Sequence, residues 1–212
     1  MHTLQSITIT TLLLLALTSP AHAHNGKVAV PVPVHGITID GDLSDWPEGM
    51  TRYPIVLSEG GIRPKDANDF AGSFRIGYDA EEDALYVGVE VQDESTVIDR
   101  TENASRETQD GCEIYLDVAH KEKEDSPAVQ YMIWGDQRGL RDLDDVQAEV
   151  RRTEGVYRYE WRIDVGRMSK GKGDLHSGTA LGFDVIVWDQ DEDGSFSQMV
   201  WGRGTDKVTP KK

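Results

Sequence analysis

Hydrophobic and polar residues alternate strictly in several short stretches of the chain. In residues 85–91, leucine and valine occupy every second position, and tyrosine, glycine and glutamate stand between them. This period of two is typical of a β-strand with one face in a protein core and the other in water. The same pattern predicts further strands at residues 112–118, 157–165 and 181–187.

Clusters of glycine, aspartate and proline separate these stretches, and helical periodicity is scarce. Asp40-Gly41, Asp110-Gly111 and Asp193-Gly194 are typical turn signals. Many short strands without alternating helices predict an all-β fold, an antiparallel β-sandwich of two sheets with a jelly-roll or immunoglobulin-like architecture. The length of the chain fits one such domain, residues 24–212.

The strand predicted at residues 112–118 has two chemically different faces. Cys112, Ile114 and Leu116 lie on one face, whereas Glu113 and Tyr115 lie on the other. Since Cys112 is the only cysteine of the chain, it has no partner for an internal disulfide. We therefore expect a buried, reduced thiol on the core side and polar chemistry on the outer side.

The first residues of the chain have the pattern of an export signal. An apolar run at residues 7–17 is too short to span a bilayer, and Ala21-His22-Ala23 fits the small-x-small cleavage pattern. We expect a signal peptide at residues 1–23 and a mature protein that starts at His24. Its location would then be secreted or periplasmic.

Charge and motifs narrow the functional classes. The formal net charge of −16 opposes binding to nucleic acids and to anionic membrane surfaces, so neither is expected as a partner. The sequence contains no G-x-S-x-G, no H-E-x-x-H and no glycine-rich phosphate loop. We therefore expect a binding protein and not an enzyme.

Five segments occur in a characteristic order. They are ITIDGDLSDWP (37–47), YDAEEDALYVGVEVQDES (78–95), QDGCEIYLD (109–117), YEWRIDV (159–165) and LGFDVIVWDQDEDG (181–194). Together they resemble a family 9 carbohydrate-binding module. The resemblance implies an antiparallel β-sandwich that binds an oligosaccharide or polysaccharide without catalysis. It also implies a role in polysaccharide recognition or degradation outside the cytoplasm, either alone or beside a partner glycoside hydrolase.

The resemblance also implies a set of polar sugar-binding residues. In such modules polar side chains of a sheet reach the sugar hydroxyls, while aromatic rings stack on the apolar C–H face. Gln109, Asp110, Glu113 and Gln130 match the polar positions. The alternation of the strand independently places Glu113 on the face opposite the core.

The aromatic positions of the family do not match. Glu107 stands where the first of two stacking tryptophans is expected. The second stacking tryptophan is expected on a C-terminal loop, but no aromatic residue follows Trp201 in this chain. Met132 stands where a basic residue is expected. Either the site uses other rings, or the scaffold serves another ligand. The best outward-facing candidates are Tyr115, Trp134 and Trp188, for which packing roles stay open.

An acidic turn near the end of the chain suggests a cation. Asp189, Asp191 and Asp193 place carboxylates at alternate positions, and Gly194 follows where a calcium loop turns sharply. The twelfth position of such a loop, which would need a bidentate glutamate, is Val200. The alternatives are therefore a calcium site and an acidic hairpin turn without metal.

Two alternative functions share the same scaffold. Some related sandwiches hold a b-type haem with methionine as an axial ligand, and Met132 and Met199 are the candidates for this role. Methionines on strands are more commonly packing residues. The other alternative is a sensor or assembly module that presents the sandwich to a partner protein.

Overall fold

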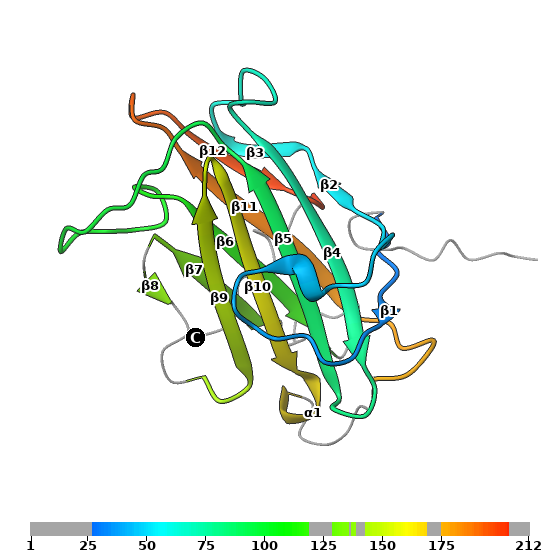
Figure 1. The fold of residues 1–212 in the computed structure, drawn as a ribbon. Coiled ribbons are helices and arrows are strands. Elements are labelled where there is room, and N and C mark those ends of the chain that lie inside the picture. The colour runs from blue at the N-terminus through cyan, green and yellow to red at the C-terminus, as the bar shows by residue number, and fades with distance from the viewer. Residues whose placement is uncertain (1–26, 119–128, 136, 139–142, 169–174, 204–212) are drawn as a thin grey trace, which may run out of the picture.

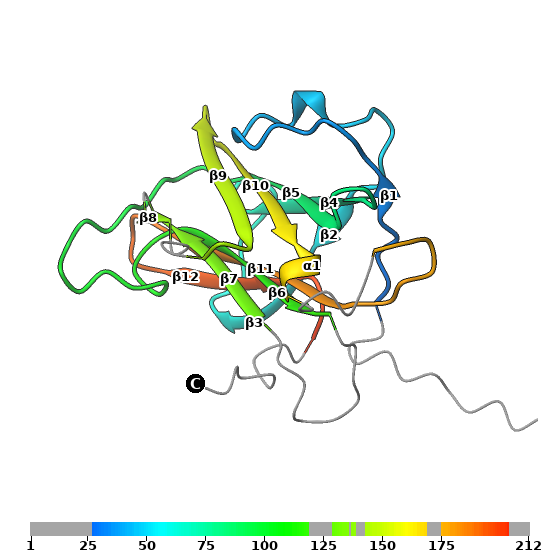
Figure 2. The same cartoon turned by 90° about the horizontal axis from the view of Figure 1, so that it is seen from below.

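The computed structural model consists of two β-sheets packed face to face (Figures 1 and 2). It describes residues 27–118, 129–135, 137–138, 143–168 and 175–203. The predicted signal peptide, residues 1–23, lies outside this part of the chain. None of the helices in the described ranges is long and apolar enough to cross a membrane.

Sheet A has the strand order β1-β4-β5-β10-β9, and β2 also pairs with β4. All its pairings are antiparallel except that of β1 with β4, which is parallel. Its strands are β1 (Val32–Pro33), β2 (Tyr53–Ile55), β4 (Ala71–Asp79), β5 (Ala84–Gln92), β9 (Val146–Thr153) and β10 (Val156–Asp164).

Sheet B has the order β3-β12-β11-β6-β7-β8 and is antiparallel throughout. Its strands are β3 (Leu57–Gly61), β6 (Gly111–Asp117), β7 (Val129–Trp134), β8 (Gln137–Arg138), β11 (Gly182–Gln190) and β12 (Phe196–Val200). The described helices are one turn each, η1 (Leu43–Asp45) and α1 (Val165–Met168). The antiparallel β-sandwich predicted from the sequence is therefore confirmed.

The core lies between the two sheets, where the alternating residues of the strands meet. Val87 and Val89 of β5 and Trp161 of β10 are completely buried there, as is the thiol of Cys112 on β6. These are the positions that the period of two assigned to the core. Burial raises the pKa of the Cys112 thiol well above its usual value.

A segment at residues 34–50 covers part of the outer face of sheet A, where Figure 2 shows it above β5 and β10. We call it the covering segment. Glu160 of β10 fastens it, because its carboxylate accepts hydrogen bonds from the Nε1 of Trp46 at 2.7 Å and from the backbone N–H groups of Asp40 and Gly41, each at 2.9 Å. A second apolar cluster forms beneath it from Val34, Leu43, Trp46, Ala84 and Tyr86.

Candidate functional site

The outer face of sheet B carries a buried carboxylate at its centre. Glu113 of β6 is 1% exposed, and the Nε2 of Gln130 on β7 donates to its Oε2 at 3.0 Å. The Oε1 of Glu113 is buried and has no hydrogen-bond partner among the described residues. Two predicted sugar-binding residues are therefore in contact, and one acceptor oxygen is left for a further donor.

An aromatic ring lies next to this carboxylate. Trp188 of β11 is 6% exposed, and its ring stacks on Phe196 of β12 with centroids 6.2 Å apart and an interplanar angle of 18°. The guanidinium of Arg106 lies over the Trp188 ring, 4.9 Å from its centroid. The Nη1 of Arg106 also forms an ion pair with the Oε1 of Glu113, at 3.7 Å. The site thus combines a carboxylate, an amide, an indole and a guanidinium.

Arg106 was not among the residues predicted from the sequence. It belongs to a loop before β6, and loop side chains have no period from which their direction can be inferred. The available signal was indirect. Met132 lies directly opposite Glu113 in the β6–β7 register, at the position where the family resemblance expects a basic residue. A cation for Glu113 therefore had to come from another part of the chain.

Electrostatics at Glu113 reflect two opposing effects. Burial raises the pKa of its carboxyl, whereas the hydrogen bond from Gln130 and the charge of Arg106 lower it. Tyr115 and Trp134, the other predicted rings, are half-buried. Tyr115 pairs across the strands with Gln130, and Trp134 pairs with Gly111, which also neighbours Trp188 across β11. All the predicted rings thus share one face of sheet B.

The remaining polar candidates form hydrogen bonds with loop backbone groups. Gln109 is completely buried, and its Nε2 donates to the backbone oxygen of Ser105 at 3.3 Å. Asp110 is 1% exposed and accepts hydrogen bonds from the backbone N–H groups of Val97 at 2.9 Å and Gln190 at 3.0 Å. These two residues fix the loops at one end of the sandwich, and none of these hydrogen bonds involves Glu113.

Asp110 belongs instead to a group of three buried aspartates. Asp93, Asp110 and Asp189 bring carboxylate oxygens within 4.8 Å of one another. Each continues the core-facing alternation of its strand beyond the last apolar residue, Val91 for Asp93 and Val187 for Asp189. The ends of β5, β6 and β11 thus bring three carboxylates together between the sheets.

The electrostatics of this group are unfavourable without a cation. Burial raises the pKa of Asp189, and the charges of Asp93, Asp191 and Asp110 raise it further. Burial is also the main cause of the raised pKa of Asp93 and of Asp110, which reaches about 6. Both carboxylate oxygens of Asp189 are buried and have no hydrogen-bond partner among the described residues. Such oxygens cost free energy unless a proton or a metal ion meets them.

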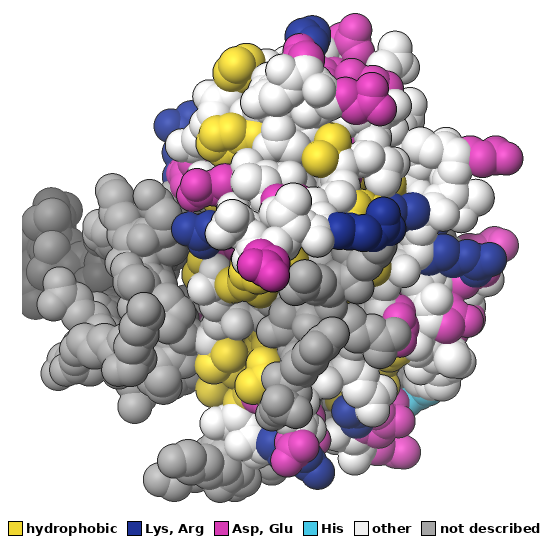
Figure 3. All heavy atoms as spheres, turned by 90° about the vertical axis from the view of Figure 1, so that its left-hand side faces the viewer, with side chains coloured by type: hydrophobic (Ala, Val, Ile, Leu, Met, Phe, Trp, Pro, Cys, Tyr) yellow, Lys and Arg dark blue, Asp and Glu magenta, His cyan; other side chains and the backbone are white. Residues whose placement is uncertain are grey.

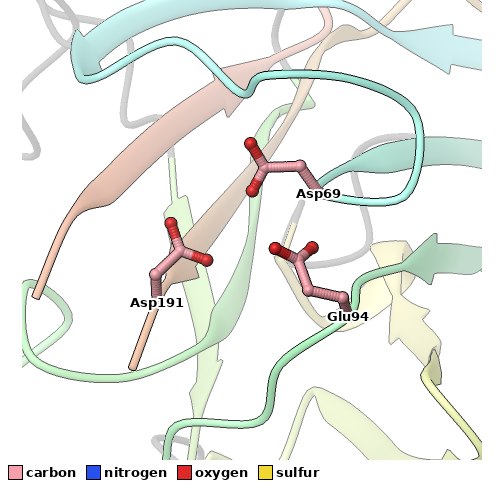
Figure 4. A group of neighbouring side chains, drawn as sticks. All are labelled: Asp69, Glu94 and Asp191. Atoms are coloured by element: carbon pink, nitrogen blue, oxygen red, sulfur yellow. The ribbon is translucent and has the colours of Figure 1, made fainter. Parts of the chain in front are cut away.

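A second acidic group lies beside the first. Figure 4 shows the carboxylates of Asp69, Glu94 and Asp191 pointing toward one another from three separate segments. Asp193 belongs to neither group, since it is 64% exposed and accepts from Ser195, with Lys65 at 3.9 Å. The three aspartates predicted as one calcium turn are therefore divided between two groups and the surface.

The donor set suits calcium better than the other common metals. Calcium prefers six to eight oxygen ligands, which carboxylates and backbone carbonyls supply, whereas zinc and copper prefer nitrogen and sulfur. All six acidic side chains offer oxygen. The unmet oxygens of Asp189 and the buried, unpartnered Oδ1 of Asp69 are the positions where a cation would relieve the charge.

The methionines considered as haem ligands lie on opposite faces of sheet B. Met199 is 5% exposed in the core, and Met132 is half-buried on the outer face, so the two do not share one ligand pocket.

Acidic and basic side chains are interspersed with small hydrophobic areas on the side of the molecule seen in Figure 3.

Solved structures with similar folds are carbohydrate-binding modules. A family 9 module from Caldicellulosiruptor kristjanssonii in complex with glucose superposes with a TM-score of 0.61 and 19% identity, covering 81% of this chain and 84% of that chain. A module from the same organism in complex with cellotriose gives a TM-score of 0.58 and 18% identity, covering 86% and 98%. At this identity the likeness establishes the sandwich fold.

The chain has no match among curated protein sequences. Its sequence does match a family model, described as "Carbohydrate family 9 binding domain-like", over residues 39–207. This match begins within the covering segment and extends past the last described strand, so it includes the site described above and every described strand except β1. The protein therefore belongs to the carbohydrate family 9 binding domain-like family.

Proposed function

We propose that this protein binds an oligosaccharide, without catalysis, on the outer face of sheet B around Glu113 and Trp188. The observation that carries this proposal is the Oε1 of Glu113, a buried acceptor without a hydrogen-bond partner among the described residues, which lies beside an indole ring and forms an ion pair with a guanidinium. Adjacent sugar hydroxyls supply the donors that this oxygen lacks. Membership of the family supports the same class of ligand.

Each group has a separate role in this proposal. Glu113 accepts a hydrogen bond from one hydroxyl, and Gln130 holds the carboxylate in place through its other oxygen. The half-buried Trp134 offers aromatic surface for the C–H face of the sugar ring, whereas Trp188, 6% exposed beneath the Arg106 guanidinium, does so only when that side chain moves. Arg106 lies where a sugar stacked on Trp188 would contact it, so its side chain either donates to the ligand or moves aside.

Neutral glucose-containing oligosaccharides are the first ligands to test. The two similar modules are described in complex with glucose and with cellotriose, and a neutral ligand avoids repulsion from a chain of net charge −16. We propose that the protein acts outside the cytoplasm beside a glycoside hydrolase that degrades the same polysaccharide. N-terminal sequencing of exported protein tests the location, since a retained Met1 contradicts it.

Calorimetric titration of the full chain with cellotriose tests the site. Glu113→Gln should weaken binding by about 1 to 3 kcal/mol, because hydrogen bonds to charged acceptors are the stronger ones. The matched control is Glu81→Gln in the exposed β4–β5 turn, which removes the same charge far from sheet B. Equal affinities of the two variants would place the sugar elsewhere on the sandwich.

We further propose that the acidic residues at the end of the sandwich hold calcium. Asp93, Asp110 and Asp189 would hold one ion, and the adjacent group of Asp69, Glu94 and Asp191 offers ligands for a second. When bound, the ion supplies positive charge that ties together strand ends of both sheets. Titration of the metal-free chain with calcium chloride measures this directly, and the absence of a binding isotherm contradicts it.

A further inference from the structure

A row of charged side chains crosses the outer face of sheet A, on the opposite side of the molecule from Glu113. Glu90 of β5 and Arg158 of β10 are partners in the strand register, and Ser73 of β4 continues the same row. Arg52, just before β2, reaches Glu90 from the β4 side. Side chains of this row are accessible, with exposed fractions of 52% for Arg52, 26% for Glu90 and 31% for Arg158.

The single carboxylate of this row is already fully used. The Oε1 of Glu90 accepts from the Nη1 of Arg52 at 2.7 Å, and its Oε2 accepts from the Nε of Arg158 at 2.9 Å. Although burial opposes it, the pKa of Glu90 is lowered by these two hydrogen bonds and by the charges of the arginines. Glu90 therefore stays ionised, and neither of its oxygens is left for a third cation.

A third arginine stands beside them without a carboxylate of its own. Arg75 projects from the same face of β4, one register row away, and is half-buried. Within the described part of the chain, no ion pair joins Arg75 to an acidic residue. Burial is the main cause that lowers the pKa of its guanidinium. The charges of Arg52 and Arg158 lower it further, and the charge of Glu90 partly opposes them. Two guanidinium groups thus bind Glu90, and that of Arg75 stands beside them. Glu160, the carboxylate in the register row of Arg75, accepts hydrogen bonds from the covering segment instead.

We propose that Arg52, Arg75 and Arg158 form a binding site for a small oxyanion, namely a carboxylate, sulfate or phosphate group. Guanidinium groups present planar pairs of N–H donors that match the paired oxygens of these anions. An anion here supplies Arg75 with an ion-pair partner, which it does not have among the described residues, and neutralises part of the positive charge of the three guanidinium groups. The group is either carried by an acidic sugar or is a free inorganic ion.

Calorimetric titration at constant ionic strength tests the site, with sodium sulfate, sodium phosphate and sodium glucuronate as separate probes. Arg75→Gln should weaken binding of the preferred probe about tenfold or more, because it removes a charge-assisted donor pair. The matched control is Arg162→Gln on the same face of β10, where the arginine is already paired with Glu82 at 2.9 Å. Tighter binding of glucuronate than of sulfate identifies an acidic sugar, and the reverse identifies a free ion.

A substitution expected to strengthen binding distinguishes loss of the site from general damage to the fold. Glu90→Gln removes the competing carboxylate, so it should strengthen binding of the same probe, whereas general damage to sheet A would weaken it. Melting temperatures of all three variants check that they fold. The proposal is overturned if none of the probes binds the wild type, if Arg75→Gln and Arg162→Gln weaken binding equally, or if Glu90→Gln weakens it.

Discussion

Two tyrosines in the sandwich interior differ in how their hydroxyl groups are satisfied. Tyr131 of β7 donates to the Oδ2 of Asp145 at 2.8 Å. Tyr159 of β10 is completely buried, and its hydroxyl has no partner among the described residues. A buried hydroxyl without a partner costs free energy, whereas a satisfied one contributes to stability. The two side chains should therefore respond oppositely to loss of the same oxygen.

Tyr159→Phe is expected to leave the free energy of unfolding unchanged or to raise it by about 1 kcal/mol, because it removes an unpaired polar atom. The control Tyr131→Phe is expected to lower it by about 1 kcal/mol, since Asp145 loses its donor. Urea denaturation of both variants measures the difference. A larger loss for Tyr159→Phe would mean that its hydroxyl has a partner, such as a buried water.

For single residues, the sequence predicted which face of its strand a side chain occupies better than it predicted which other side chains it contacts. The period of two placed Glu113 on the outer face of its strand and Cys112 in the core, and the structure has both there, although Glu113 is buried on its face. It also carries information about Asp93 and Asp189, which continue core-facing alternations into the acidic group. Arg106 could not be predicted in this way, because its position depends on the path of a loop.

The covering segment is held on sheet A by several hydrogen bonds to a single side chain. Glu160 anchors it with three hydrogen bonds, and Gly88 of β5 lies directly beneath. A Cβ at position 88 would approach the side chains of Leu43 and Trp46 to 3.1 Å, so a glycine allows the segment to lie close to the sheet. The packing of the covering segment on sheet A therefore depends on the carboxylate of Glu160 and on the lack of a side chain at Gly88.

Glu160→Ala is expected to release the covering segment while the two sheets stay paired. Its three donors lose their acceptor, at a cost of about 3 kcal/mol or more, since hydrogen bonds to charged groups are strong. Hydrogen exchange should quicken in residues 34–50 and stay slow in β10. The control Gln147→Ala alters an exposed residue of β9 and should change neither. Unchanged exchange in residues 34–50 would contradict the anchoring role.

The strands differ in how clearly the alternation of hydrophobic and polar residues predicts them. The strands β5, β6, β10 and β11 were predicted within a few residues, because valine, leucine and aromatic residues fill their core positions. In β4 the core-facing series begins with Gly72, and Gly77 interrupts the outer series, so the pattern is weaker. Glycine is needed at both positions because neighbouring side chains occupy the space that a Cβ would fill, namely Phe70 at Gly72 and Val34 at Gly77.

On the scale of the whole molecule, the acidic groups make one end of the sandwich sensitive to pH and to cations. Sheet A contributes Asp93, and sheet B contributes Asp110 and Asp189. Their raised pKa values mean that the folded state binds protons more tightly than the unfolded state. Without metal, stability is therefore lost as pH rises above the ordinary aspartate value of 3.8, through about 6 for Asp110 and beyond it for the others.

We expect the melting temperature of the metal-free chain to fall between about pH 4 and pH 8, because the carboxylates must ionise in a buried site. Calcium should raise it, and the gain should grow with pH, since the ion competes with protons for the same oxygens. Melting curves with calcium and with chelator at each pH measure both effects.

Two variants show whether these effects arise at the buried group. Asp189→Asn should reduce both the pH dependence and the calcium gain, because it removes the carboxylate whose two oxygens lack partners. Asp193→Asn, at the exposed turn, should leave both unchanged. Calcium effects that are equal in the two variants would contradict the proposed site.

The fold class and carbohydrate binding were predictable from the sequence, and both are confirmed by the family match and the similar structures. Both follow from features repeated along the chain, namely strand alternation and the order of five segments. Export, calcium and the glycoside hydrolase partner stay predictions. The sugar site was harder to predict, because it depends on side chains of β6, β7, β11 and a loop that meet only in the folded molecule.

Cys112 gives this protein a natural reporter of its own opening. It is the only thiol of the chain, it is completely buried between the sheets, and burial keeps it protonated. A thiol reagent can therefore modify it only in molecules whose sheets have separated. The rate of labelling under native conditions consequently measures how often the sandwich opens, without an engineered probe.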